Sequence, residues 1–197
     1  MTPSSCVRMA EYNRWMNARL YQAAARLSEP DLFLERGAFF GSLFDTLNHI
    51  AVGDFIWLQR FALHPELDWM RASMQALPRP AALRQRLAGS LPELRGYRER
   101  ADQVICEFAA GLSDAMLAHV LQYTNTSGQA HAKEFGALVQ HFFNHQTHHR
   151  GQASTLLFQA GVDIGVTDLV AIVPDAPLVA VPAEAGSGAG EGRTGRC

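Results

Sequence analysis

Residues 141–152 read His-Phe-Phe-Asn-His-Gln-Thr-His-His-Arg-Gly-Gln and contain four of the protein's eight histidines. Apolar residues continue on both sides of this stretch at intervals of three and four, the period of a helix with one buried face. They are Leu138, Val139, Phe142, Phe143, Leu156, Leu157 and Phe158. The pattern predicts one long helix from about Phe135 to Ala160, capped at its C-terminus by Gly161.

Two of these histidines, His145 and His149, are four residues apart, so their rings lie one above the other on a helix and can reach one metal ion. Spacing alone also permits the pairs His141 with His145 and His145 with His148. The alternative is a polar helix face that carries solvated histidines. The adjoining phenylalanines argue against it, because imidazoles in apolar surroundings need polar or metal partners.

A third metal ligand has to come from elsewhere in the chain, since a pair on one helix does not complete a site. His49 lies inside another predicted helix, and a lone histidine there is more often a buried structural residue than a ligand. The need for a third ligand makes it a candidate. We expect His64 in a loop and both His119 and His131 at the surface.

Three further long helical segments are expected before the histidine-rich helix. The first runs from about Arg8 to Leu27. The second begins at Ser42, where a capping box is expected, and runs to about Phe61. The third runs from Ala81 to about Ala110 with a break near Gly89. Four long helices predict an all-α four-helix bundle.

Some segments depart from the regular helical pattern. β-Branched and aromatic residues flank Asn125-Thr126-Ser127-Gly128 and predict a small hairpin or extended excursion before the last helix. A short helix is expected at Trp69–Met74. Gly151 weakens the last helix, which would be explained by a close contact with another helix. Residues 1–173 are expected to form one domain, and the Pro/Ala/Gly-rich residues 174–197 a disordered tail.

Composition narrows the class of protein. The chain has 197 residues, 48% of them hydrophobic, enough for one domain with a substantial core. The net charge of −2 argues against a nucleic-acid partner. Three cysteines without metal or redox spacing favour a reducing compartment. No apolar run of about 18 residues is present. We therefore expect a soluble, cytoplasmic protein without a membrane partner.

Several short sequence motifs, taken together, resemble those of the DinB family of metal-binding four-helix proteins. That family is related to thiol-dependent S-transferases and to mycothiol-dependent maleylpyruvate isomerase. The resemblance extends nearly to Leu169. The matching motifs are Asn13-Arg14-Trp15-Met16-Asn17, residues 37–42, Thr46-Leu47-Asn48-His49, Asp54-Phe55-Ile56-Trp57-Leu58, residues 144–152 and Gly161-Val162-Asp163. The motifs that contain histidines are the more specific for this family.

The resemblance implies a particular set of metal ligands. In the family, one histidine of the second long helix and a pair four residues apart on the last helix bind a divalent metal. These positions correspond to His49, His145 and His149. His141 and His148 would then lie beside the site or at the surface.

Other residues of the same motifs are candidates for orienting the metal ligands or for joining the helices. Metal-bound imidazoles usually donate their second N–H to a partner, and Asn48, Asn144 and Asp54 are candidates for this role. Arg150 is a candidate ion-pair residue that holds helices together, with contact to a substrate anion as the alternative.

Three neutral ligands leave an open coordination position, at which a water or thiol becomes acidic. The resemblance implies thiol transfer, thiol-dependent isomerisation or hydrolysis of an unidentified small molecule. Zinc, nickel, iron or manganese would be the cofactor, together with a low-molecular-weight thiol in the first two cases. The alternatives are a non-catalytic metal-binding stress-response protein and a helical dimerisation module. A homodimer is expected under each hypothesis.

Overall fold

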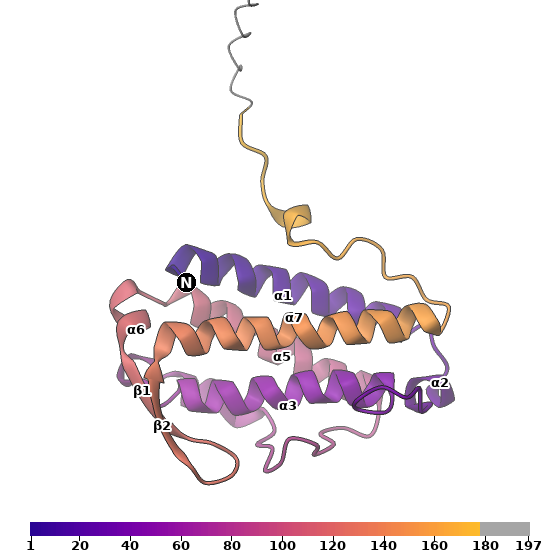
Figure 1. The fold of residues 1–197 in the computed structure, drawn as a ribbon, viewed down its shortest axis with the longest axis horizontal. Helices are drawn as coiled ribbons and strands as arrows, with labels where there is room; N and C mark the ends of the chain where they lie inside the picture. Colours follow the sequence, from indigo (N-terminus) through magenta and orange to yellow (C-terminus); the bar gives the residue numbers. More distant parts are fainter. Residues whose placement is uncertain (178–197) are drawn as a thin grey trace, which may run out of the picture.

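Four long helices lie side by side in the computed structural model, which describes residues 1–177 (Figure 1). They are α1 (Pro3–Ala24), α3 (Leu43–Phe61), α5 (Leu91–Ala110) and α7 (Phe135–Gln159). Helix α1 packs on α5 and α7, and α3 packs on the same two helices. The pairs α1–α5 and α3–α7 therefore form two opposite faces of the bundle. The predicted all-α four-helix architecture is confirmed.

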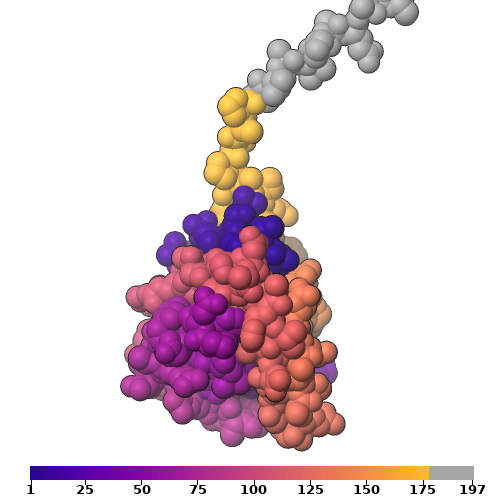
Figure 2. Space-filling model, turned by 90° about the vertical axis from the view of Figure 1, so that its left-hand side faces the viewer, coloured from indigo at the N-terminus to yellow at the C-terminus, as the bar shows by residue number. Residues whose placement is uncertain are grey.

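Short elements connect the four helices. They are α2 (Glu29–Phe33), the 3-10 helix η1 (Pro65–Leu67), α4 (Met70–Ser73), the 3-10 helix η2 (Met74–Ala76), α6 (Asp114–Ala118), β1 (Val120–Thr124), β2 (Ala130–Glu134) and the 3-10 helix η3 (Leu169–Ile172). The two strands pair antiparallel, with Val120 opposite Glu134 and Thr124 opposite Ala130. The predicted hairpin and the short helix after residue 69 are thus confirmed. In the space-filling view, the end of the molecule shows the hairpin segment beside the turn that follows α3 (Figure 2).

Side chains near the helix ends explain where the helices begin and stop. The Ser42 hydroxyl accepts a hydrogen bond from the Asp45 N–H at 3.1 Å and donates to the Asp45 carboxylate at 2.7 Å. Gly161, with φ of 78°, follows α7 in the left-handed region. The Gly161 N–H donates to the Phe158 carbonyl and the Val162 N–H to the Leu157 carbonyl, which completes a Schellman cap.

The segment after α7 lies along α1 (Figure 1). The Tyr12 hydroxyl donates to the Thr167 carbonyl at 2.6 Å, and Arg19 donates to the Ile164 carbonyl at 2.7 Å. These bonds attach the segment after α7 to α1 as far as Thr167. The predicted disordered tail falls mainly on residues 178–197, which lie outside the described part of the chain.

A layer of buried polar side chains crosses the apolar core and involves all four long helices. Asp54 of α3 accepts hydrogen bonds from Arg98 of α5 and, at 2.7 Å, from Gln146 of α7. Burial raises the pKa of the Asp54 carboxyl to about 6, while the charge and hydrogen bond of Arg98 act in the opposite direction. Arg98 also contacts Asp102 at 3.0 Å, and Asn17 of α1 donates to Asp102 at 2.9 Å.

Arg150 belongs to the same layer, and the predicted ion pair at this residue is wrong. Its buried guanidinium donates to Asn13 of α1, to Gln146 and to Thr147, and among residues 1–177 it has no carboxylate partner. Burial lowers the pKa of Arg150 to about 10. The residue does join α7 to α1, but through a hydrogen bond to the side-chain amide of Asn13.

Two other sequence predictions are also wrong. Residues 81–90 are irregular, and α5 begins only at Leu91 with Ser90 as its N-cap. Asn48 holds this segment against α3, since its side chain donates to the Gln85 carbonyl and accepts from the Leu87 N–H, both at 2.8 Å. Gly151 is exposed, and a Cβ there would meet nothing within 4 Å. No close helix contact explains it.

Across residues 1–177, no helix combines the length and the apolar character needed to span a bilayer.

Candidate metal centre

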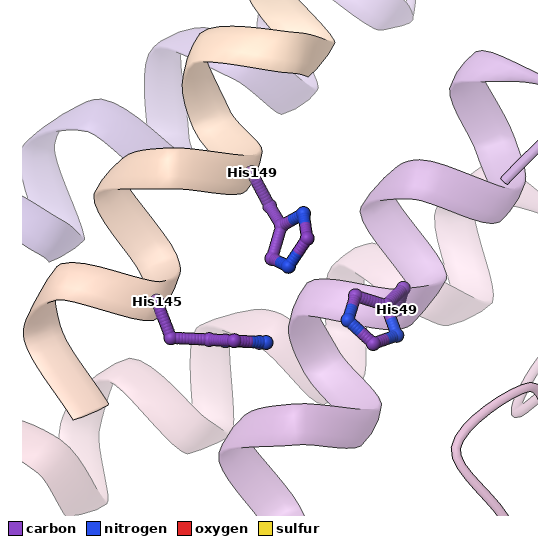
Figure 3. Close-up of side chains that lie close together, drawn as sticks. All are labelled: His49, His145 and His149. Carbon is purple, nitrogen blue, oxygen red and sulfur yellow. The ribbon is translucent and has the colours of Figure 1, made fainter. Parts of the chain in front are cut away.

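Three histidines meet where α3 and α7 face each other (Figure 3). His49 comes from α3, and His145 and His149 come from successive turns of α7. One ring nitrogen of each lies within 4.8 Å of a ring nitrogen of the other two. The structure therefore brings together the three residues that the resemblance implied. The close α3–α7 packing accounts for the convergence, because it places one turn of α3 opposite two turns of α7.

Hydrogen bonds fix the orientation of two of the rings. His49 Nδ1 lies 3.2 Å from the Leu83 carbonyl oxygen, and His149 Nδ1 lies 2.8 Å from Gln152 Oε1. Both partners are acceptors, so each Nδ1 carries the proton and donates. Each Nε2 is then left with a free lone pair, the form that a metal ligand requires.

The third ring, His145, has no hydrogen-bond partner among the described residues, and packing holds it instead. It lies against the α3 backbone at Gly53. Phe40 covers the other side of the cluster, stacked on His49 with ring centroids 3.9 Å apart and edge-on to His149 at 5.4 Å.

The surroundings of the cluster keep the imidazoles neutral. Burial lowers the pKa of His49 to about 4 and that of His145 to about 3, and it lowers the pKa of His149 as well. The cation Arg84 adds to the shift at His49. Its guanidinium lies 5.0 Å from the Phe39 ring centroid and 5.6 Å from that of Phe40. A divalent ion held by three neutral imidazoles would keep its full charge, and Arg84 would add to its attraction for an anion.

The remaining histidines lie outside the group of three. His141 and His148 are exposed on α7, against Trp57 and His149 respectively. His119 is exposed and His131 half-buried. His64 lies in the turn after α3 as predicted, but it is buried, and its Nδ1 accepts from the Glu66 N–H at 3.2 Å.

The predicted orienting partners are wrong. Asp54 bonds to Arg98 and Gln146, and Asn144 is exposed on α7. Asn48 acts indirectly, by holding the segment that carries the Leu83 carbonyl. Gln152, the residue that orients His149, could have been found from its spacing of three on the same helix. The Leu83 carbonyl has no signature in the sequence, because any residue provides one.

Comparison with known proteins agrees with this geometry. The family model described as DinB family matches residues 1–175. The chain belongs to the DinB family. It is also 25% identical to Protein DinB of Bacillus subtilis (strain 168) over 161 residues, which cover 82% of this chain and 89% of that protein. The match includes all four long helices and all three histidines of this DinB-family chain. Family membership and the histidine group together fit a metal-binding protein.

Proposed function

We propose that His49, His145 and His149 hold one divalent cation and that the protein is a metal-dependent enzyme acting on a thiol or on water. The observation that carries this proposal is the convergence of three neutral imidazoles, two of them fixed with Nε2 unprotonated. Imidazole nitrogens suit zinc, nickel, copper and iron, so three histidines fit a divalent transition metal without selecting one of them.

A divalent ion on three neutral ligands keeps its full charge and an open position, where it lowers the pKa of a thiol or water. The chain supplies the rest of the site. Phe40 shields the His49 and His149 rings from solvent on one side. Arg84 attracts an anionic reactant such as a thiolate or carboxylate towards the exposed Phe39. The reaction is thiol transfer, thiol-dependent isomerisation or hydrolysis of a small molecule.

Metal analysis tests the first half of the proposal. The metal content of protein purified without an affinity tag is measured by mass spectrometry, before and after substitution of each histidine. We expect about one divalent ion per chain, lost in His49→Ala, His145→Ala and His149→Ala. His148→Ala is the matched control, because it removes an exposed histidine of the same helix and should retain the ion. A parent protein that cannot be loaded would refute the site.

Turnover tests the second half. The loaded protein is incubated with low-molecular-weight thiols and electrophiles, and loss of the electrophile is followed with and without a chelator. Metal-dependent consumption supports the enzyme. No turnover with any thiol or hydrolysable ester, combined with a large fall in melting temperature on chelation, would instead favour a non-catalytic metal-binding protein. In that case, the ion would serve to join α3 to α7.

Association is a separate proposal. We propose that the chain forms homodimers, since bundles commonly bury part of their surface in symmetric pairs. Light scattering coupled to gel filtration gives the mass directly, to be compared with 21.6 kDa for one chain.

A further inference from the structure

A hollow of about 490 Å³ lies between α1 and α5. This is the bundle face opposite the α3–α7 pair that carries the histidines, so the hollow is independent of the metal centre. Its volume falls in the range of small-molecule sites, and most of its lining surface is carbon.

The floor of the hollow is polar and buried. Asn17 and Tyr21 of α1 and Arg98 and Asp102 of α5 line it, each no more than 5% exposed. These residues are continuous with the polar layer that crosses the bundle, because Arg98 bonds to Asp54. The hydrogen bond between the charged groups of Arg98 and Asp54 therefore fixes the position of the floor.

Two donors on this floor have neither a hydrogen bond nor an ion-pair contact within residues 1–177. Within the described residues, neither the Tyr21 hydroxyl nor Arg98 Nε has a hydrogen-bond partner, although both atoms are buried. Burial keeps the pKa of Tyr21 above its ordinary value, so the hydroxyl retains its proton. Buried donors without acceptors are costly, and a bound molecule that supplies an acceptor oxygen would relieve the cost. The Asp102 carboxylate beside them offers an acceptor for a ligand N–H.

The charges of the lining residues balance. Three arginines and three acidic residues surround the hollow: Arg14, Arg95, Arg98, Glu99, Asp102 and Glu107. Arg95 pairs with Glu99 at 2.7 Å, and Arg98 already lies between two carboxylates. An additional anion on the floor would therefore lie beside the Asp102 carboxylate, and the one floor cation, Arg98, is already paired.

We propose that this hollow binds a small uncharged molecule carrying an amide, with its carbonyl oxygen on Tyr21 and Arg98 and its N–H on Asp102. Apolar parts of the ligand fill the carbon-lined space above the floor. Cys106 lies in the wall of the hollow and is half-buried, which makes its thiol a reporter of occupancy.

Protection of Cys106 from alkylation tests the proposal in the full chain. The probe is N-acetyltryptophanamide, and N-ethylmaleimide labelling of Cys106 is followed by mass spectrometry in a Cys197→Ser background. Cys6 is fully buried and should not label. We expect saturable slowing of the Cys106 reaction by the amide and little slowing by N-acetyltryptophan, which has the same body with a carboxylate.

Two matched variants identify the floor as the binding element. Tyr21→Phe removes only the unpartnered hydroxyl and should weaken protection about fivefold. Tyr12→Phe removes a hydroxyl from the same helix that bonds to Thr167 outside the hollow, so protection should be unchanged. Melting curves of both variants establish that they are folded.

Three results would overturn the proposal. The first is no protection at any soluble concentration of the amide. The second is equal protection by the carboxylate, or in Tyr21→Phe. The third is protection that rises with protein concentration in the absence of any probe, which would show that a second copy of the chain covers this face.

Discussion

Gly53 of α3 and His145 of α7 are in such close contact that a Cβ on Gly53 would lie 2.6 Å from His145 Cε1 and 3.2 Å from Nδ1. Carbon atoms do not approach to 2.6 Å without displacement of one group. The absence of a side chain at Gly53 therefore allows the His145 ring to lie against the α3 backbone, one turn after His49 on the same helix.

The first prediction concerns this contact. Gly53→Ala should lower metal affinity on the order of 10–100-fold, the size of effect seen when an outer-shell support is lost, because His145 must rotate away. Isothermal titration with zinc measures it. Gly151→Ala is the control, since this exposed glycine lies on α7 with nothing near it. That variant should gain up to about 1 kcal/mol of stability without a change in affinity. Equal affinities of the two variants would contradict the role of Gly53.

The second prediction concerns the ring orientation of His149. Gln152→Leu removes the acceptor for the His149 Nδ1–H at 2.8 Å, and metal affinity should fall about tenfold. Gln152→Glu keeps an acceptor oxygen and should retain or increase the affinity. Gln140→Leu, at an exposed position of the same helix, controls for the added apolar surface. A loss of metal affinity in Gln152→Glu as large as that in Gln152→Leu would show that this hydrogen bond does not contribute to metal binding.

The long helices and the histidine group were predictable from the sequence for different physical reasons. Apolar residues at helical intervals define α1, α3 and α7, because each must bury one face. The spacing of four between His145 and His149 fixes their common direction once the helix is known. The choice of His49 as their neighbour depended on the resemblance, since spacing cannot bring two separate helices together.

The path of residues 81–90 and the roles of the glycines could not be predicted, because they depend on tertiary contacts that leave no local pattern in the sequence. Residues 81–90 carry helix-forming residues, yet Asn48 holds their backbone in an irregular path, and Arg86 pairs with Asp45 at 2.7 Å. A side chain 37 residues away in sequence thus overrides local propensity. The roles of Gly53 and Gly151 could not be assigned for the same reason, because each depends on whether a side chain of another helix faces the glycine.

The third prediction concerns the buried polar layer and is independent of any metal. Asp54→Ala leaves the Arg98 guanidinium, 2% exposed, beside a single remaining carboxylate and removes the acceptor of Gln146. The loss of one partner of a buried pair costs about 3–5 kcal/mol of unfolding free energy, measured by urea denaturation. Glu99→Ala breaks the exposed Arg95–Glu99 pair and should cost less than about 1 kcal/mol. Similar costs for the two variants would show that Asp54 is not a structural centre of the bundle.

The fourth prediction concerns pH. A histidine can bind a metal only when it is neutral, and an imidazole is neutral above its pKa. The pKa of His49 lies near 4 and that of His145 near 3, both lowered mainly by burial, whereas a solvated histidine titrates near 6.5. Protons should therefore begin to compete for these two ligands only as the pH falls towards about 4.

Equilibrium dialysis against zinc across a pH series should show occupancy that changes little between neutral pH and about pH 5 and falls sharply below it. Circular dichroism on the same samples separates loss of metal from loss of fold. Release of half the metal near pH 6.5 in folded protein would mean that the histidines titrate as if solvated. The cluster would then be open to water, and the shielding assigned to Phe40 would be wrong.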